Sequence, residues 1–562
     1  MEHLFQFWSQ LASCWNSLPI LGFSLTAFAL LFVFIKRRRS WSRYPPGPPS
    51  LPFLGNMLQI DFYNPHLSFN QLNKKFGNVF SLQYFWSNMV VVNGYKAVKD
   101  ALVQKAEDFA DRPYFPKYAH LGYNKRSQGL IISRYGPAWR QQRRFALCTL
   151  KNFGMGKKSL ENQISQEAGY LCSAFSSKEG HPFDPLFLVK KAVSNVIYSL
   201  TFGERFDYDD EKFQRLVEIF QQSMKEESGF LPQLLNEVPF LLRIPRVPQK
   251  VFQYQRASMS LIDAILKKHK ETWDSTHIRD FTDAFLQEME KVGNQQDLFE
   301  CIVLCLVNTL VKEQSLLVPF IYKATHMLLY MKQSANATSN VVQCRIISLV
   351  LIKSSLGCLN NPMLEAPVHF RPNSVDESPL DTLYLAHIKC PFPGKVHEEI
   401  DKVIGRDRSP NMLDQANMPY ANAVIHEIQC YGDIVPTGLP HMTYRDTELQ
   451  GFFIPKDTVI ITNLSSVLKD ETFWEKPHQF YPKHFLDADG QFVKREAFLP
   501  FSAGRRICLG EQLARMELFL FFTSLLQCFT FQVPEDQPSP QEDGCFAIIH
   551  FPYPYQIQAI LR

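Results

Sequence analysis

The sequence lacks an excess of charge of either sign. Its 562 residues carry 59 Lys and Arg against 55 Asp and Glu, a formal net charge of +4. Proteins that bind nucleic acid present a strongly basic field, so this balance predicts no nucleic-acid partner. Disorder is not expected either, because 46% of the residues are hydrophobic and 20% are charged, a composition that allows a large buried core.

The twelve cysteines lack the pattern of a disulfide framework. Their spacing is irregular, and no two of them form a Cys-x-x-Cys pair. This usage is typical of reduced thiols that face the cytosol. The sequence also lacks internal repeats, which excludes the solenoid architectures.

One apolar run, Leu18 to Ile35, contains no charge. As a helix it would be about 27 Å long, roughly the hydrocarbon thickness of the endoplasmic reticulum membrane. Lys36 to Arg39 follow the run, whereas Glu2 is the only charged residue ahead of it. This asymmetry predicts that residues 1–44 form a lumenal tail, a transmembrane helix and a basic stop-transfer segment, with the rest of the chain in the cytosol. A cleaved signal peptide is the alternative, but it needs positive charge before the run and small residues at a cut site.

Beyond the anchor, helical periodicity dominates. Residues 45–56 are Pro-rich and predict a stiff hinge. Residues 57–294 alternate short strands with longer amphipathic helices, and residues 396–562 read as helix, hairpins, loop and helix. The expected fold class is therefore mainly α with a small β portion. The clearest predicted strands are Val79 to Leu82 and Met89 to Val92, and the clearest helices are Phe213 to Met224, Val251 to Lys268 and Phe281 to Val292.

Residues 295–395 differ in character from both flanks. Charge thins out, five of the cysteines gather here, and apolar runs alternate with patches of Pro, Ser and Asn. Cys301 to Leu310 and Val341 to Ile352 predict buried helices. The segment is predicted to be foreign to the fold around it, in the manner of translated non-coding sequence or of a mispredicted exon.

The strongest chemical signal is the loop Phe501 to Glu511, which contains Cys508 and leads into the apolar helix Leu513 to Phe529. Gly504 and Gly510 allow backbone to approach the sulfur closely. Arg506 and the amino end of the following helix favour a thiolate, and Phe501 can shield it from water. An anionic sulfur in this setting is a strong electron donor to a metal, so Cys508 is the predicted metal ligand and catalytic residue.

This loop matches the pattern F-x-x-G-x-R-x-C-x-G at every fixed position, so the chain resembles a microsomal cytochrome P450. Over residues 1–294 and 396–562 it most resembles family 2, subfamily D. The resemblance implies the cytochrome P450 fold, haem b (iron protoporphyrin IX) ligated by Cys508, and electrons from NADPH through NADPH-cytochrome P450 reductase, with cytochrome b5 as a further partner. The motifs that carry the subfamily likeness are Arg126 to Gly129, Lys225 to Phe230 and Ile461 to Asp470.

Trp139 and Arg143 lie four residues apart on one face of a helix that begins near Pro137. Together they can bind an acid group, although such a pair is more often a solvated basic face. The resemblance assigns them to a haem propionate. It completes the predicted cofactor site with Arg112, His441 and Arg506, beside Phe501, Gly504, Cys508 and Gly510.

The predicted substrate pocket rests on the resemblance alone. Relatives bind basic, often aromatic amines, and Glu227 stands where they have an amine-pairing carboxylate. Phe546 occupies an aromatic pocket position. Ile131 and Ile548 stand where amine-binding relatives show Phe, which widens the expected substrates to small lipophilic molecules of basic-amine, xenobiotic or fatty-acid-like chemistry.

Two departures from the family pattern affect the predicted chemistry. The oxygen-binding helix signature A/G-G-x-D/E-T-T is missing from the sequence, and its expected place is the foreign segment. The E-x-x-R pair reads Glu427-Ile428-Gln429-Cys430, without the arginine. His484, if protonated, is predicted to pair with Glu427 instead.

Three functional hypotheses follow from these features. The first is an active haem-thiolate monooxygenase that uses NADPH through the reductase. The second is a non-catalytic or misfolded haem-binding membrane protein derived from that family. The third is a peroxide-consuming or isomerising haem-thiolate enzyme, which would not need the missing threonine.

Overall fold

The computed structural model describes residues 44–52, 54–85, 87–121, 129–155, 158–292, 318–319, 321–327, 394–535, 537, 544–547 and 549–562, together with Ser24 and Phe28. The chain divides into two compact units. Unit 1 consists of residues 1–114, 437–467 and 502–507, and unit 2 of residues 115–436, 468–501 and 508–562.

Unit 1 is built on a four-stranded sheet with the order β1-β2-β6-β3. The β-branched valines of β1 and β2 suit a half-buried sheet, and these two strands form an antiparallel hairpin in which Val79 faces Val92. β2 then pairs in parallel with β6, Met89 opposite Val459, which brings distant parts of the chain into one sheet. The elements of unit 1 are η1 (Met57–Gln59), α2 (Pro65–Phe76), β1 (Val79–Tyr84), β2 (Ser87–Val92), α3 (Gly94–Lys99), the π-helical turn η2 (Asp100–Gln104), β3 (His441–Met442), β4 (Thr447–Leu449), β5 (Phe452–Ile454), β6 (Val459–Thr462), the start of α17 (Leu464–Leu468) and η6 (Gly504–Arg506).

The described residues of the Pro-rich segment, 45–52 and 54–56, form no helix, as expected from the locked φ angles of proline. It is hydrogen-bonded to β1: the Ser81 amide donates to the Pro46 carbonyl at 3.0 Å, and the Ser81 hydroxyl donates to the Pro45 carbonyl at 2.6 Å. These two hydrogen bonds therefore fix the start of the predicted hinge to the sheet of unit 1.

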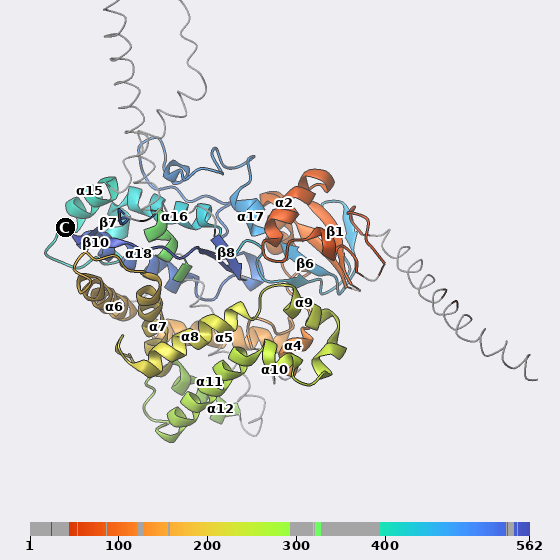
Figure 1. Cartoon of the computed structure of the whole chain (residues 1–562), viewed down its shortest axis with the longest axis horizontal. Coiled ribbons are helices and arrows are strands. Elements are labelled where there is room, and N and C mark those ends of the chain that lie inside the picture. The colour runs from red at the N-terminus through yellow and green to blue at the C-terminus, as the bar shows by residue number, and fades with distance from the viewer. Residues whose placement is uncertain are drawn as a thin grey trace, which may run out of the picture. The chain divides into compact units, whose positions relative to one another are not determined.

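Unit 2 is mainly helical (Figure 1). Its strands form two-stranded pairs, β7 with β10 and β8 with β9. Its elements are α4 (Pro116–His120), α5 (Pro137–Asn152), α6 (Lys158–Ser176), α7 (Leu186–Phe202), α8 (Glu211–Lys225), α9 (Phe230–Glu237), η3 (Pro239–Arg243), α10 (Val247–Val251), α11 (Gln253–Glu271), α12 (Phe281–Val292), α15 (Gly394–Val403), η4 (Asp414–Asn417), α16 (Pro419–Gly432), η5 (Pro482–Phe485), α18 (Glu511–Cys528), β7 (Phe529–Gln532), β8 (Gly544–Ala547), β9 (Ile549–Pro552) and β10 (Gln558–Leu561).

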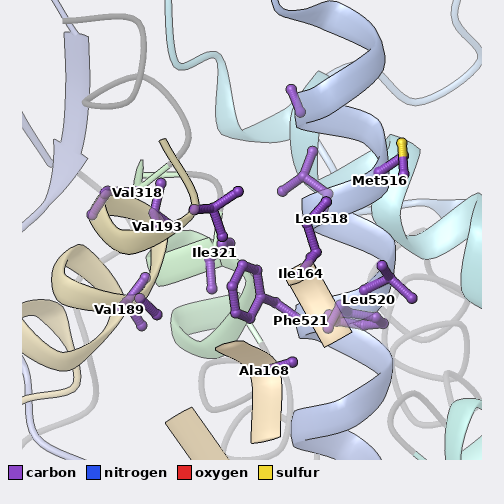
Figure 2. Close-up of a cluster of buried hydrophobic side chains, with 14 of the residues drawn as sticks. Ile164, Ala168, Val189, Val193, Val318, Ile321, Met516, Leu518, Leu520 and Phe521 are labelled. Atoms are coloured by element: carbon purple, nitrogen blue, oxygen red, sulfur yellow. The ribbon is translucent and has the colours of Figure 1, made fainter. Parts of the chain in front are cut away.

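The core of unit 2 surrounds α18. Every residue from Met516 to Leu526 in this helix is buried, as expected for a helix that is apolar on all faces. Figure 2 shows Leu518 and Phe521 of α18 among side chains of α6 and α7, including Ile164. Since α18 begins three residues after Cys508, the packing of this helix fixes the point from which the cysteine loop departs.

A carboxyl group is also buried in α18. Glu517 is fully buried, and neither of its carboxyl oxygens has a hydrogen-bond partner within the described part of the chain. Burial raises the pKa of this carboxyl well above its ordinary value, because an unpaired charge in the core is strongly disfavoured. Burial therefore favours the protonated form of Glu517 in the folded protein.

Few residues of the segment predicted to be foreign are described. Those at 318–319 and 321–327 are helical and buried in the core of unit 2. The Tyr322 ring stacks on Tyr555 with centroids 4.4 Å apart, and the Lys323 ammonium donates to the Gly432 carbonyl at 2.9 Å. The predicted helices Cys301 to Leu310 and Val341 to Ile352 lie outside the described residues.

The predicted transmembrane helix also falls outside the description, apart from Ser24 and Phe28. Among the helices that the structure does describe, none combines the length and the apolar character needed to cross a bilayer.

Candidate functional site

Three residues predicted to bind the haem propionates lie together in unit 1. His441 and Arg506 contact the short segment Phe109 to Arg112, which contains the third, Arg112. His441 Nδ1 lies 2.7 Å from the Phe109 carbonyl oxygen, and Arg506 Nε donates to the Ala110 carbonyl at 2.7 Å. The Arg112 guanidinium reaches across to the carbonyls before His441, donating to Leu439 at 2.9 Å and Pro440 at 2.7 Å. Backbone carbonyls of these two segments thus hold all three side chains in place.

The charges in this group favour an anionic ligand. Arg112 and Arg506 are 5% and 8% exposed, and His441 is 3% exposed. Burial holds the pKa of His441 well below its usual value, and the positive charges of Arg112 and Arg506 lower this pKa further. The contact of the His441 ring with the Phe109 carbonyl acts in the opposite direction. The group therefore contains two buried cations and a neutral imidazole, a donor set that suits two carboxylates such as the haem propionates.

The backbone of the cysteine loop bends sharply where it leaves this group. Gly504 has a φ of +74°, and a Cβ placed there would lie 1.7 Å from the Leu102 carbonyl oxygen. Ser502 also adopts a positive φ, of 62°. Gly504 is required at this turn on two counts, because a larger residue would be strained and would collide with the backbone of η2.

Cys508 itself belongs to unit 2 and is partly exposed. Its amide donates to the Phe501 carbonyl at 3.1 Å, which closes the loop. Gly510 is the residue before α18, and its carbonyl accepts the Ala514 amide at 2.8 Å in the first turn. Cys508 thus lies close to the amino end of a long helix, where the helix dipole favours a thiolate.

The predicted aromatic–cation pair of α5 forms in unit 2. The Arg143 guanidinium lies 5.5 Å from the centre of the Trp139 ring. The Trp139 indole N–H donates to the Leu130 carbonyl at 3.0 Å, and the ring is 4% exposed. Trp139 therefore positions Arg143 through its ring face, while its own donor is bound to the preceding loop.

The pair predicted to replace the missing arginine is present. Glu427 Oε2 lies 3.1 Å from His484 Nδ1, and Glu427 Oε1 accepts the Tyr481 amide at 2.9 Å. Burial raises the pKa of Glu427, and the contact with His484 only partly opposes this shift. Lys469 lies nearby and was not indicated by the sequence. Burial gives this lysine a lowered pKa, although Cys430, Asp433 and Glu427 partly oppose the shift.

The structure describes the side chains of only some of the predicted substrate residues. Glu227 is 5% exposed, and its Oε2 accepts the Tyr118 hydroxyl at 2.6 Å. Tyr118 was missed because it lies on α4, more than 100 residues away, and no sequence signal connects the two. Ile131 is partly buried in the turn before α5. Phe546 lies in β8, but its side chain is outside the description, as is the whole of Ile548.

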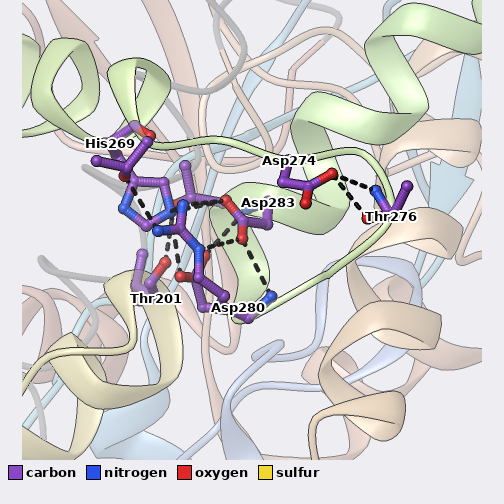
Figure 3. A network of polar contacts seen from close by, with 9 residues as sticks. Thr201, His269, Asp274, Thr276, Asp280 and Asp283 are labelled. Carbon is purple, nitrogen blue, oxygen red and sulfur yellow. Dashed lines mark hydrogen bonds and ion pairs between the residues drawn. The ribbon is translucent and has the colours of Figure 1, made fainter.

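A second cluster of unit 2 has the chemistry of metal ligands. His269 Nε2 lies 3.1 Å from Asp280 Oδ2 and 2.9 Å from Asp283 Oδ1 (Figure 3). Arg279 already supplies a cation, because its Nε donates to Asp283 Oδ2 at 2.6 Å and its Nη2 to Oδ1 at 2.9 Å. Burial lowers the pKa of His269, but the two aspartates outweigh it and the net pKa is raised. The cluster balances its own charge and ties the end of α11 to the start of α12.

Comparison with known proteins defines the class. A sequence model described as Cytochrome P450 matches residues 45–308 and 393–559, more than half of the chain. The chain therefore belongs to the cytochrome P450 family, whose cysteine thiolate donates electron density to a haem iron. By family it is a cytochrome P450 monooxygenase.

Within this family, the chain is similar to members of subfamily 2D. It is 49% identical to cytochrome P450 2D6 of Homo sapiens over 550 residues, which cover 97% of this chain and 99% of that protein. It is 47% identical to cytochrome P450 2D15 of Canis lupus familiaris, over 96% of this chain and 98% of that protein. Cytochrome P450 2D14 of Bos taurus is 48% identical, with coverage of 97% and 99%.

Proposed function

We propose that this chain is a haem-thiolate monooxygenase that inserts one atom of dioxygen into small lipophilic substrates, using electrons from NADPH delivered by NADPH-cytochrome P450 reductase. The observation that carries this proposal is the cysteine loop, in which Gly504 packs against backbone and Cys508 precedes a buried helix. Haem b, when bound, supplies the iron centre at which dioxygen is reduced and cleaved.

The residues of this chain would hold that cofactor in distinct ways. Cys508 would ligate the iron, while Phe501 would limit the access of water to the sulfur. Arg112, His441 and Arg506 would bind propionate oxygens, because two buried cations and a neutral imidazole form a donor set that suits carboxylates. Arg143, positioned by Trp139, would add a further cation. Gly504 and Gly510 would keep the loop compact on either side of the ligand.

Glu227 supports basic amines as one substrate class. The carboxylate is buried, so a cationic amine that pairs with it gains more than it would at an exposed site. Tyr118 donates to the same carboxylate and would hold it in one orientation. Ile131, Phe546 and Ile548 would contribute apolar surface for the rest of the substrate.

Reductase-supported turnover tests this function. The full-length chain in lipid vesicles, with the reductase and NADPH, should oxygenate a lipophilic aromatic amine and also a neutral carbon analogue of the same shape. Glu227→Gln should raise KM for the amine by about tenfold, the equivalent of 1.4 kcal/mol, and leave the neutral analogue unchanged. Oxygenation of neither compound, with NADPH consumed and hydrogen peroxide released, would support the non-catalytic alternative.

That alternative, a haem-binding protein without oxygenase activity, has a specific observation in its favour. The family match omits residues 309–392, where the oxygen-binding helix is expected and its signature is missing. Product formation that requires added peroxide and ignores the reductase would instead indicate a peroxide-driven enzyme.

We also propose that the chain is anchored in the endoplasmic reticulum membrane by Leu18 to Ile35, with the catalytic units in the cytosol. The basic residues Arg140 and Arg144 on the exposed face of α5 would then be open to an acidic redox partner, the reductase or cytochrome b5. Protease treatment of sealed microsomes should digest both units and protect only the N-terminal tail. Protection of the catalytic units would refute this orientation.

A further inference from the structure

The cluster of His269, Asp280 and Asp283 brings three possible metal ligands together at the junction of two helices of unit 2. His269 lies in the last turn of α11, Asp280 directly precedes α12, and Asp283 is the third residue of α12. The imidazole nitrogen and one carboxyl oxygen from each aspartate all lie within 4.8 Å of one another (Figure 3). Three such atoms at this separation can surround a single metal ion.

The backbone orients both aspartates. Asp280 Oδ1 accepts the Asp283 amide at 3.0 Å, and Asp283 Oδ2 accepts the Arg279 amide at 3.0 Å. The other oxygen of each carboxylate is thereby directed at the histidine: Asp280 Oδ2 lies 3.1 Å from His269 Nε2, and Asp283 Oδ1 lies 2.9 Å from it. Hydrogen bonds of this kind, made by the oxygens that do not bind the metal, hold the ligand atoms in place before an ion arrives.

One of these oxygens lacks a hydrogen bond. His269 Nε2 can carry a single hydrogen, but it contacts Asp283 Oδ1 and also lies 3.3 Å from Arg279 Nη2. Asp280 is 1% exposed, and its Oδ2 has no hydrogen-bond partner among the residues that the structure describes. A buried carboxylate oxygen without a donor is strongly disfavoured. A cation bound between this oxygen and His269 Nε2 would satisfy it.

The dimensions of the cluster suit a transition metal. Zinc binds nitrogen and oxygen at about 2.0–2.1 Å, so two ligand atoms of a tetrahedral zinc site lie about 3.3 Å apart. The contacts of His269 with Asp280 and Asp283 are slightly shorter, and a small expansion would admit the ion. An imidazole ligand favours zinc and its neighbours over Mg²⁺ and Ca²⁺, which prefer oxygen alone. The two carboxylate charges balance one divalent cation.

Arg279 is the competitor for this position. Its guanidinium donates to both oxygens of Asp283, so in the metal-free protein it supplies the positive charge. Its side chain is 33% exposed and can turn toward solvent without opening the core. That movement would leave the fourth position on the ion facing water, the coordination of a zinc ion with three protein ligands.

We propose that His269, Asp280 and Asp283 form a binding site for a divalent transition metal, that Zn²⁺ fits it best, and that Zn²⁺ binds by displacing the Arg279 side chain. The bound ion would join the end of α11 to the start of α12 in place of the arginine ion pair. The site is separate from the cysteine loop and does not depend on the proposed oxygenase activity.

Zinc titration of the full-length chain tests the proposal. After removal of adventitious metal with a chelator, competition with a zinc indicator should show that the wild-type protein binds one more Zn²⁺ than His269→Gln or Asp280→Asn does. Asp280→Asn keeps the oxygen that accepts the Asp283 amide, so the start of α12 is preserved. The matched control is His478→Gln, which removes an exposed histidine lying 3.4 Å from Glu471; this variant should bind as much zinc as wild type, with the same affinity.

Arg279→Gln separates a metal site from a purely structural ion pair. Because the competing cation is gone, this variant should bind Zn²⁺ about tenfold more tightly than wild type, even though it loses the ion pair to Asp283. A cluster that serves only as an ion pair gives no such gain.

X-ray absorption of the wild-type protein with one equivalent of Zn²⁺ identifies the ligands directly. It should show only nitrogen and oxygen, at about 2.0–2.1 Å. Sulfur at about 2.3 Å would place the ion on a cysteine and overturn the proposal. So would equal zinc binding by wild type and Asp280→Asn, or weaker binding by Arg279→Gln. Because the absorption measurement needs no variant, a folding defect in any variant leaves the test intact.

Discussion

Replacing Gly504 with alanine should destabilise the cysteine loop by an amount that its geometry fixes. At a φ of +74° an alanine is strained by about 1–2 kcal/mol. Its Cβ would also lie 1.7 Å from the Leu102 carbonyl oxygen, so backbone must move, at a further cost of about 1–3 kcal/mol. We therefore expect Gly504→Ala to lower the free energy of unfolding by about 2–5 kcal/mol.

Gly451 provides a matched control in the same unit. It has a φ of +83°, and a Cβ there would meet nothing within 4 Å. Gly451→Ala should therefore show the conformational strain alone, about 1–2 kcal/mol. Arg506 and Cys508 follow Gly504 in the loop, so Gly504→Ala should also retain less haem per chain than Gly451→Ala.

The assay is urea unfolding of the wild-type protein and both variants, with the haem content of each purified protein measured in parallel. The unfolding curves should be ranked wild type, Gly451→Ala, then Gly504→Ala, and only the last should lose haem. Equal losses of stability in the two variants, with equal haem content, would show that the close approach to Leu102 does not constrain the loop.

Two further predictions concern buried carboxyl groups. The pKa of Glu517 is raised in the folded protein, so its contribution is full below about pH 4.5 and is lost as the pH rises toward the folded-state pKa, by about 1.4 kcal/mol per pH unit. Glu517→Gln should therefore gain stability relative to wild type as the pH rises above about 5, and a constant difference in unfolding free energy would contradict this. Glu427→Leu removes the acceptor of both the Tyr481 amide and the His484 ring, and should cost about 3–5 kcal/mol. Glu427→Gln keeps an oxygen acceptor and should cost less; equal unfolding midpoints for the two would argue against the pair.

The local elements could be predicted well from the sequence. The expected strand Val79 to Leu82 forms the first part of β1, and Met89 to Val92 forms the last part of β2. The predicted helix Phe281 to Val292 is α12 with the same bounds, and Phe213 to Met224 lies within α8. The apolar helix expected to end at Phe529 stops one residue earlier, because Phe529 pairs with Leu561 as the start of β7. Hydrophobic periodicity indicates local conformation, and these elements depend mainly on local conformation.

Contacts between distant segments were not accessible from the sequence. The parallel pairing of β2 with β6 and the convergence of His441 and Arg506 on Phe109 to Arg112 depend on tertiary packing, which leaves no local pattern. The same holds for the Tyr118 hydroxyl on Glu227 and for the Trp139 N–H on Leu130. The contact between Glu427 and His484 could be predicted, because both residues lie in motifs that are recognisable in the sequence.

The most direct test of the account is the optical spectrum of the reduced, carbon-monoxide-bound protein. The full-length chain should show the signature of a haem whose iron is ligated by a thiolate, and Cys148→Ser should keep it. Cys508→Ser should lose that signature, whether or not haem remains bound. A Cys508→Ser protein that retains its haem with an unchanged spectrum would contradict the assignment of Cys508 as the iron ligand, and with it the proposed function.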